Sequence, residues 1–259
     1  MNYSSGLEYL IGSSYSYSQI NYFSKNVDDN YGFKEIEFDF FEVSYRRKTT
    51  PSEYKPKQRY STPYPASHEF IPEIFLKPSR PKTRFVVDNN EVKNIAEETF
   101  ELMMKEKMPS NISINVLPFD EFKALHSSFG AWSNGILGFS SNGNGKKIFA
   151  RENNLDSLML VVGHEIGHVL TETLPNRHDE EAKAFAFSVE WAKTIKKHNV
   201  ANLGLNIKEE LDFQPARNGL HDIAFGFVDF LVKKGVNALQ LHDDLAKRYV
   251  SIFNTFYPK

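Results

Sequence analysis

Two histidines and a glutamate share one short stretch, His164-Glu165-Ile166-Gly167-His168. Residues four apart on an α-helix differ by about 40° around the axis and about 6 Å along it, so both imidazoles can bind one metal ion. Glu165 points about 100° away from His164, which places it beside the metal rather than on it. This HExxH spacing predicts a zinc site, in which Glu165 takes a proton from the metal-bound water as that water attacks a carbonyl group.

A catalytic zinc site needs a third protein ligand. The chain has no cysteine, so a histidine or a carboxylate must supply it. The turn at residues 174–177 predicts that the next helix returns antiparallel beside the first, which places the ligand on the order of 9 Å past the turn. Asp179, Glu180 and Glu181 lie near enough. Helical phase puts both Glu180 and Glu181 on apolar faces and does not choose between them.

The elements that must position these residues follow from hydrophobic periodicity after residue 85. The long apolar helix that contains the motif begins after Asn153 or Asn154, and Val161 and Val162 pack beside the histidines. The residues after His178 are expected to be helical, with breaks. The other expected elements are a helix over 89–107, a strand over 112–118, a short helix over 119–125 and a hairpin formed by 135–139 and 146–151.

The N-terminal third has a different composition. Residues 1–43 carry 2 basic and 7 acidic side chains, whereas residues 44–84 carry 10 basic and 3 acidic ones and 7 of the 12 prolines. A proline-rich basic segment cannot continue a helix, so residues 44–84 are expected to form an extended arm. Alternating aromatic and acidic residues at 36–40 predict a strand before the arm. We interpret the arm as a linker or strap, with a contact surface for a partner as the alternative.

Several classes of protein are excluded by composition. No run of 18 apolar residues exists, so a transmembrane helix is not expected. The start lacks a secretory signal, which with the absence of cysteine favours a cytoplasmic protein. The net charge of −2 gives no general attraction to nucleic acid, although tyrosines in the basic arm could stack on bases.

The motif at 164–168, followed by Glu-Ala-x-x-Phe-Ala at 181–186, resembles the gluzincin metallopeptidases. Within that group the pattern over 89–195 is most similar to the small ImmA/IrrE-like and minigluzincin-type peptidases. The resemblance implies that Glu181 is the third zinc ligand beside His164 and His168, with Glu165 as the general base.

The resemblance also implies a tyrosine or histidine from the C-terminal helices that stabilises the oxyanion. His221 is the candidate, with Tyr249 and His242 as alternatives. One departure is Lys183, because the ImmA/IrrE-like pattern usually has asparagine at that position.

These observations predict an α+β, zincin-like fold over residues 85–259. It should contain a small mixed β-sheet packed on the motif helix and the glutamate helix, followed by a helical C-terminal part. Residues 1–84 would form a non-catalytic region with a regulatory or assembly role and a candidate surface for a protein partner. An edge strand from 135–140 or 146–151 would bind the substrate backbone.

The expected function is a zinc-dependent endopeptidase that acts on a peptide or protein, with Zn²⁺ as the cofactor. The alternative is a catalytically idle zincin-fold subunit with a structural or binding role in a larger assembly. The intact His164, Glu165 and His168 set favours the enzyme.

Overall fold

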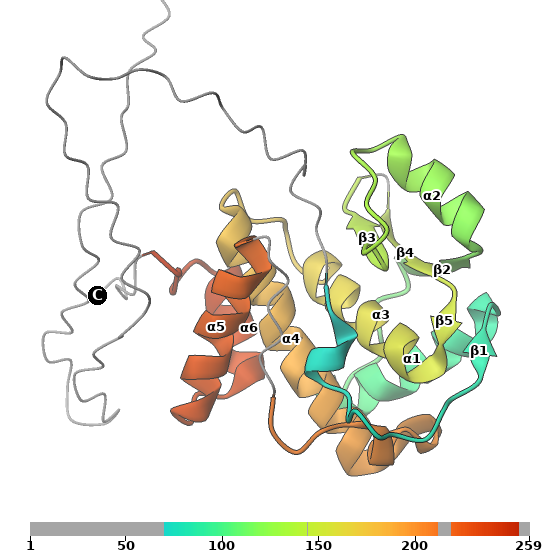
Figure 1. Cartoon of the computed structure of the whole chain (residues 1–259). Helices are drawn as coiled ribbons and strands as arrows, with labels where there is room; N and C mark the ends of the chain where they lie inside the picture. Colours follow the sequence, from blue (N-terminus) through green and yellow to red (C-terminus); the bar gives the residue numbers. More distant parts are fainter. Residues whose placement is uncertain (1–69, 144, 212–218, 254–259) are drawn as a thin grey trace, which may run out of the picture. The chain divides into compact units, whose positions relative to one another are not determined.

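The computed structural model describes residues 70–143, 145–211 and 219–253 (Figure 1). They belong to one compact unit, which spans Gln58–Lys259. Helices and small sheets are combined in the described part, and this confirms the predicted α+β class. The strand predicted at 36–40 and the arm up to residue 69 lie outside the described residues.

A three-stranded mixed sheet has the strand order β2-β4-β3. The central strand β4 (Lys146–Arg151) is parallel to β2 (Ile112–Leu117) and antiparallel to β3 (Gly138–Ser141). The alternating Ile112, Ile114 and Val116 of β2 are buried, as their period of two predicted. The hairpin is confirmed, and β3 rather than β4 is an edge strand of this sheet.

Helices cover both faces of the sheet (Figure 1). The motif helix α3 (Leu155–Val169) and α1 (Asn89–Met104) pack on one face, and α2 (Phe119–Ser127) lies on the other. Asp88 caps α1 by accepting a hydrogen bond from the Asn90 amide. This helix ends before the predicted Lys107, because Lys105 has a left-handed backbone with φ of 62°.

The motif helix packs closely on α4 (Arg177–His198). A Cβ atom at Gly167 would lie 2.9 Å from both Ala184 Cα and Phe187 Cβ, so only glycine allows this approach. Asn176 caps α4 by accepting from the His178 amide. The predicted return helix is therefore present, and its first turn faces the histidines of α3.

The C-terminal part is helical, as expected, and packs on α4. Its longer helices α5 (Leu220–Lys233) and α6 (Ala238–Ala246) both contact α4. The remaining short elements are η1 (Pro72–Ile74), β1 (Phe85–Val86), β5 (Asn153–Asn154), η2 (Val200–Asn202) and η3 (Gly204–Asn206). No helix among the described residues has the length and apolar character that crossing a bilayer requires.

Residues 70–84, which we call the strap, were assigned to the arm but pack as part of the core. Four of its apolar side chains are buried, namely Phe70, Ile74, Phe75 and Leu76. Arg80 and Thr83 both donate to the buried carboxylate of Asp156 at the start of α3, over 2.6 and 2.9 Å. The predicted arm, which ends at residue 84, therefore includes residues that pack with the core. Composition predicted an extended chain here, whereas the strap contains the 3-10 helix η1 (Pro72–Ile74) and buries these apolar residues.

Candidate metal centre

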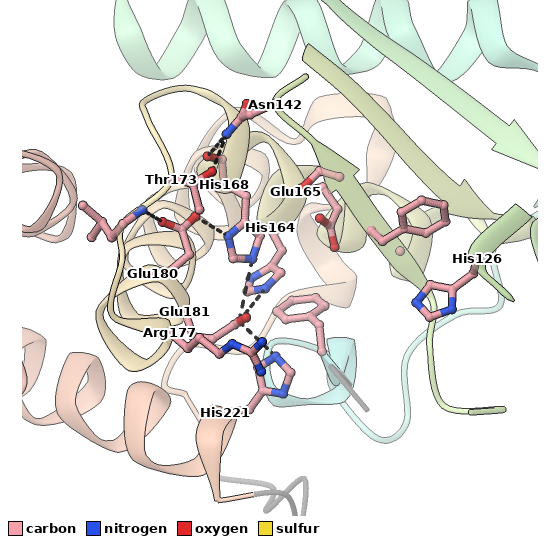
Figure 2. A pocket seen from close by; sticks show the side chains of 15 residues that line it. His126, Asn142, His164, Glu165, His168, Thr173, Arg177, Glu180, Glu181 and His221 are labelled. Carbon is pink, nitrogen blue, oxygen red and sulfur yellow. Dashed lines mark hydrogen bonds and ion pairs between the residues drawn. The ribbon is translucent and has the colours of Figure 1, made fainter. Parts of the chain in front are cut away.

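Three side chains from two helices point toward one another in a cleft (Figure 2). The Nε2 atom of His164 lies 3.5 Å from Glu181 Oε2, and the Nε2 atom of His168 lies 3.7 Å from the same oxygen. Ligand atoms about 2.1 Å from one tetrahedral zinc are about 3.4 Å apart. The two distances to Glu181 Oε2 are close to this value, and two imidazoles with a carboxylate are a suitable set of donors for zinc.

The two glutamates that the sequence left as alternatives have different neighbours. Glu181 faces the Nε2 atoms of both histidines, whereas Glu180 Oε1 accepts a hydrogen bond from His168 Nδ1 at 2.8 Å. A carboxylate on Nδ1 holds the ring in place and leaves Nε2 for a metal. The geometry thus gives Glu181 the position of a ligand and Glu180 the position of a support.

His164 is held in the matching tautomer by Ser188. Its Nδ1 lies 3.2 Å from the Ser188 hydroxyl, which donates its single proton to the Ala184 carbonyl over 2.8 Å. The hydroxyl can therefore only accept from His164, so the imidazole carries its proton on Nδ1. Its Nε2 lone pair then points toward Glu181, as metal binding requires.

Lys183 is fully buried and contacts residues that hold His168 in place. Its ammonium group donates to Glu180 Oε2 at 3.0 Å, to the Glu172 carbonyl at 3.0 Å and to the His168 carbonyl at 3.3 Å. These three contacts use all three of its N–H groups. The Leu174 amide also donates to Glu180 Oε2 at 2.7 Å. Lys183 therefore holds both the backbone of His168 and the carboxylate that orients its ring.

The charges in the site oppose the effect of burial. Burial alone would lower the pKa of His168, but the charge of Glu181 and the hydrogen bond to Glu180 raise it to about 9. For His164, burial dominates and lowers the pKa to about 3. Burial alone would raise the pKa of Glu181, but the charges of His168 and His221 hold it well below its usual value. In the metal-free chain His164 is thus neutral and Glu181 is ionised, which are the protonation states that metal binding requires.

Glu165 lies beside these residues, against the edge strand. A Cβ atom at Gly138 would lie 2.5 Å from Val161 Cγ1 and 3.1 Å from Glu165 Oε1, so only glycine lets β3 approach. Burial raises the pKa of Glu165, and the charge of His168 and a hydrogen bond with Ser140 act against this. A carboxyl group with a raised pKa is well suited to take up and release a proton near neutral pH.

His221 comes to the site from the start of α5. Its Nε2 lies 2.9 Å from Glu181 Oε2, and its side chain is 3% exposed. The ligand atoms of His164, Glu181 and His221 all lie within 4.8 Å of one another, so these three residues form a second possible set of metal ligands. The set with His168 is the one that the HExxH spacing predicts, and His164 and His168 each have a partner on Nδ1.

The cleft around these residues has a volume of about 300 Å³. The edge strand β3 forms one side, with Gly138 and Ser140 among the lining residues. Phe70 of the strap forms another side, and its ring stacks on His164 with 4.2 Å between the ring centroids. The candidate ligands are therefore covered by an aromatic ring on one side and open to the cleft on another.

The structure brings together all five predicted site residues, His164, Glu165, His168, Glu181 and His221. The alternatives to His221 lie elsewhere: His242 packs on Phe187, and Tyr249 is exposed.

Sequence reasoning missed Ser188 and Phe70 as parts of the site. The position of Ser188 one turn past Ala184 carried no signal, and Phe70 was hidden in the proline-rich arm.

Comparisons with known protein families, with curated proteins and with solved structures found no match to this chain.

Proposed function

We propose that this chain is a zinc-dependent endopeptidase with a zincin-like fold. The observation that carries the proposal is the convergence of two imidazole Nε2 atoms and one carboxylate oxygen, at 3.5 and 3.7 Å, with a buried glutamate beside them. His164, His168 and Glu181 would hold the metal. The resemblance of the sequence to gluzincins supports the same set.

Glu165 would act as the general base. A bound zinc ion lowers the pKa of a water molecule toward about 7 and polarises a carbonyl group. Glu165 would accept a proton from the attacking water and deliver it to the departing amine, and its raised pKa favours this role. Because Glu165 lies in the cleft wall next to β3, its carboxylate is near any backbone that follows this strand.

His221 would stabilise the oxyanion that forms on the attacked carbonyl. It lines the cleft, and its Nε2 lies 2.9 Å from Glu181 Oε2. A donor there would act on the charge that develops during the attack.

The 2.9 Å contact between His221 and Glu181 also supports a second candidate function. If His221 took a metal position together with the other three ligands, the site would have no open position, and the chain would be an idle structural or binding subunit.

The substrate would be an extended peptide segment. The edge of β3 offers backbone groups to such a segment, and pairing of this kind gives affinity with little dependence on sequence. Strand addition lets the segment continue beyond both ends of the cleft, which favours cleavage within a chain over removal of a terminal residue.

The test is the metal content and activity of the purified full-length protein. We expect one zinc per chain after dialysis against zinc, hydrolysis of an unstructured protein, loss of hydrolysis with a chelator and recovery when zinc is restored. Absence of bound metal would overturn the proposal. One firmly bound zinc without hydrolysis would support the idle subunit, and zinc binding that weakens strongly in His221→Ala would identify His221 as a ligand.

A further inference from the structure

Aromatic rings form a row across the sheet, on the face opposite α3. Phe139 of β3 is paired with Phe149 of β4, and their rings stack with 4.9 Å between centroids. His126 and Phe129, from α2 and the loop after it, contact Phe139 at 5.1 and 5.7 Å. We call His126, Phe129, Trp132, Phe139 and Phe149 the aromatic face.

The aromatic face is continuous with the cleft and reaches the surface. Phe139 and His126 belong to it and also line the cleft. Phe129 is 65% exposed, and Trp132, whose ring contacts His126, is half-buried. An exposed aromatic surface of this kind commonly marks a place where another chain binds. Its position next to the proposed catalytic residues indicates that the other chain is the substrate.

The register of β3 decides which substrate side chain would reach this face. Successive residues of a strand point to opposite sides, so Gly138 and Ser140 face Glu165 and α3, whereas Phe139 faces α2. A segment that pairs with the free edge of β3 would place the residue opposite Phe139 on the same side. That side chain would extend the row that begins with Phe149 and Phe139.

We propose that the aromatic face is a substrate subsite that selects an aromatic side chain in the peptide. The inference rests on the proposed function, because it takes the extended peptide as the occupant of the β3 edge. Rings in neighbouring strands attract one another beyond the area they bury, so an aromatic residue opposite Phe139 binds better than a small or charged one. Phe129 is the residue that determines this preference, since its exposed ring forms the outer side of the subsite.

The activity test uses the full-length zinc-loaded protein and short blocked peptides of alanine, serine and glycine. One phenylalanine is moved along the peptide, and kcat/KM is compared with that of the all-small peptide. We expect about a 10-fold increase at one position. In Phe129→Ala this ratio should fall toward one. The matched control is Phe85→Ala, because Phe85 is 60% exposed on β1, and it should keep the ratio of the unchanged protein.

A binding test separates this inference from the proposed function. The chain has two tryptophans, and Trp191 is fully buried with its indole bonded to the Met159 carbonyl. A change of fluorescence on adding peptide therefore reports on Trp132. In zinc-free Glu165→Gln, which cannot turn over, we expect the phenylalanine peptide to bind about 5-fold more tightly than the small peptide, and Phe129→Ala to remove the difference.

The outcomes are distinct. Tighter binding of the phenylalanine peptide in a protein that hydrolyses nothing would support the subsite and reject the peptidase. Hydrolysis with no preference at any position, together with equal binding of both peptides, would reject the subsite and leave the peptidase. A fluorescence change that follows protein concentration rather than peptide concentration would assign the aromatic face to a second copy of this chain, and would also overturn the inference.

Discussion

The ring of Phe70 lies flat against the imidazole of His164, with 4.2 Å between the centroids and 19° between the planes. Phe70 is 5% exposed and also contacts Phe185 of α4. The strap is therefore in direct contact with a proposed metal ligand. Removal of the strap should affect both stability and the site.

The first prediction is that a chain starting at Lys82 is much less stable than one starting at Gln58. The shorter chain lacks Phe70, Ile74, Phe75 and Leu76, all of which are buried. Burial of each such side chain contributes about 1.5–3 kcal/mol, so the free energy of unfolding should fall by several kcal/mol. Urea unfolding of both chains measures this. Equal midpoints would show that the strap is not part of the core. Because the strap is expected to stabilise the domain, a truncation that tests the N-terminal region for regulation should begin at Gln58 and keep the strap.

The second prediction concerns the two adjacent glutamates. Glu181→Gln and His168→Ala should abolish zinc retention, because each removes a proposed ligand. Glu180→Gln should only weaken zinc binding, by about 10- to 100-fold, since it removes the support of His168 Nδ1. Competition with a chromophoric chelator measures the zinc affinity. Glu172→Gln, an exposed position in the same loop region, is the control and should bind zinc normally. Equal losses in Glu180→Gln and Glu181→Gln would contradict the assignment.

The third prediction is that Glu165→Gln retains zinc and fold but loses peptide hydrolysis. The loss should be at least about 100- to 10,000-fold in kcat, because glutamine cannot accept the proton of the attacking water. Zinc content and steady-state kinetics on one preparation measure both properties. Unchanged hydrolysis by this variant would point to a contaminating protease.

The fourth prediction is that Lys183→Met weakens zinc binding through Glu180. Removal of one partner leaves a buried charge without its counterion, which typically costs about 3–5 kcal/mol of stability. In the double variant with Glu180→Gln, the effect of Lys183→Met on the zinc affinity should be smaller than in the single variant. Arg80→Met serves as the control, because it breaks a pair with the buried Asp156 at the other end of α3. Arg80→Met should lower the melting temperature without changing the zinc affinity. Additive effects of Glu180→Gln and Lys183→Met on the zinc affinity would contradict the prediction.

The fifth prediction is a stability optimum of the metal-free chain near pH 6.5. The pKa of His168 is raised to about 9 in the folded state, so its contribution is complete below about pH 6.5 and is lost as the pH rises toward 9. The pKa values of His164 and His242 are lowered to about 3 and about 4. These two histidines bind protons only after unfolding, so they destabilise the fold as the pH falls below about 6.5.

Urea unfolding in the presence of a chelator, repeated across this pH range, measures the optimum. His168→Ala should remove the decline between pH 6.5 and 9 while the decline at low pH persists. A metal-free stability that rises through pH 9 would contradict the assignment of the raised pKa to His168.

The sequence by itself determined the local part of this protein. The spacing of His164 and His168 places them one helical turn apart, and it requires no knowledge of the fold. Periodicities of two and of 3.6 residues likewise predicted the strands, the hairpin and the helices over 89–198, with errors at the ends of elements such as α1. These features follow from interactions between residues near one another in the chain.

Only the tertiary structure decided how these pieces meet. Helical phase left Glu180 and Glu181 equivalent, and the approach of α4 to α3 at Gly167 turned one toward Nε2 and the other toward Nδ1 of His168. The proline-rich composition of the strap gave no sign that Phe70 stacks on His164. These contacts join residues far apart in the sequence, so they depend on helix crossing and side-chain packing, which no local pattern records.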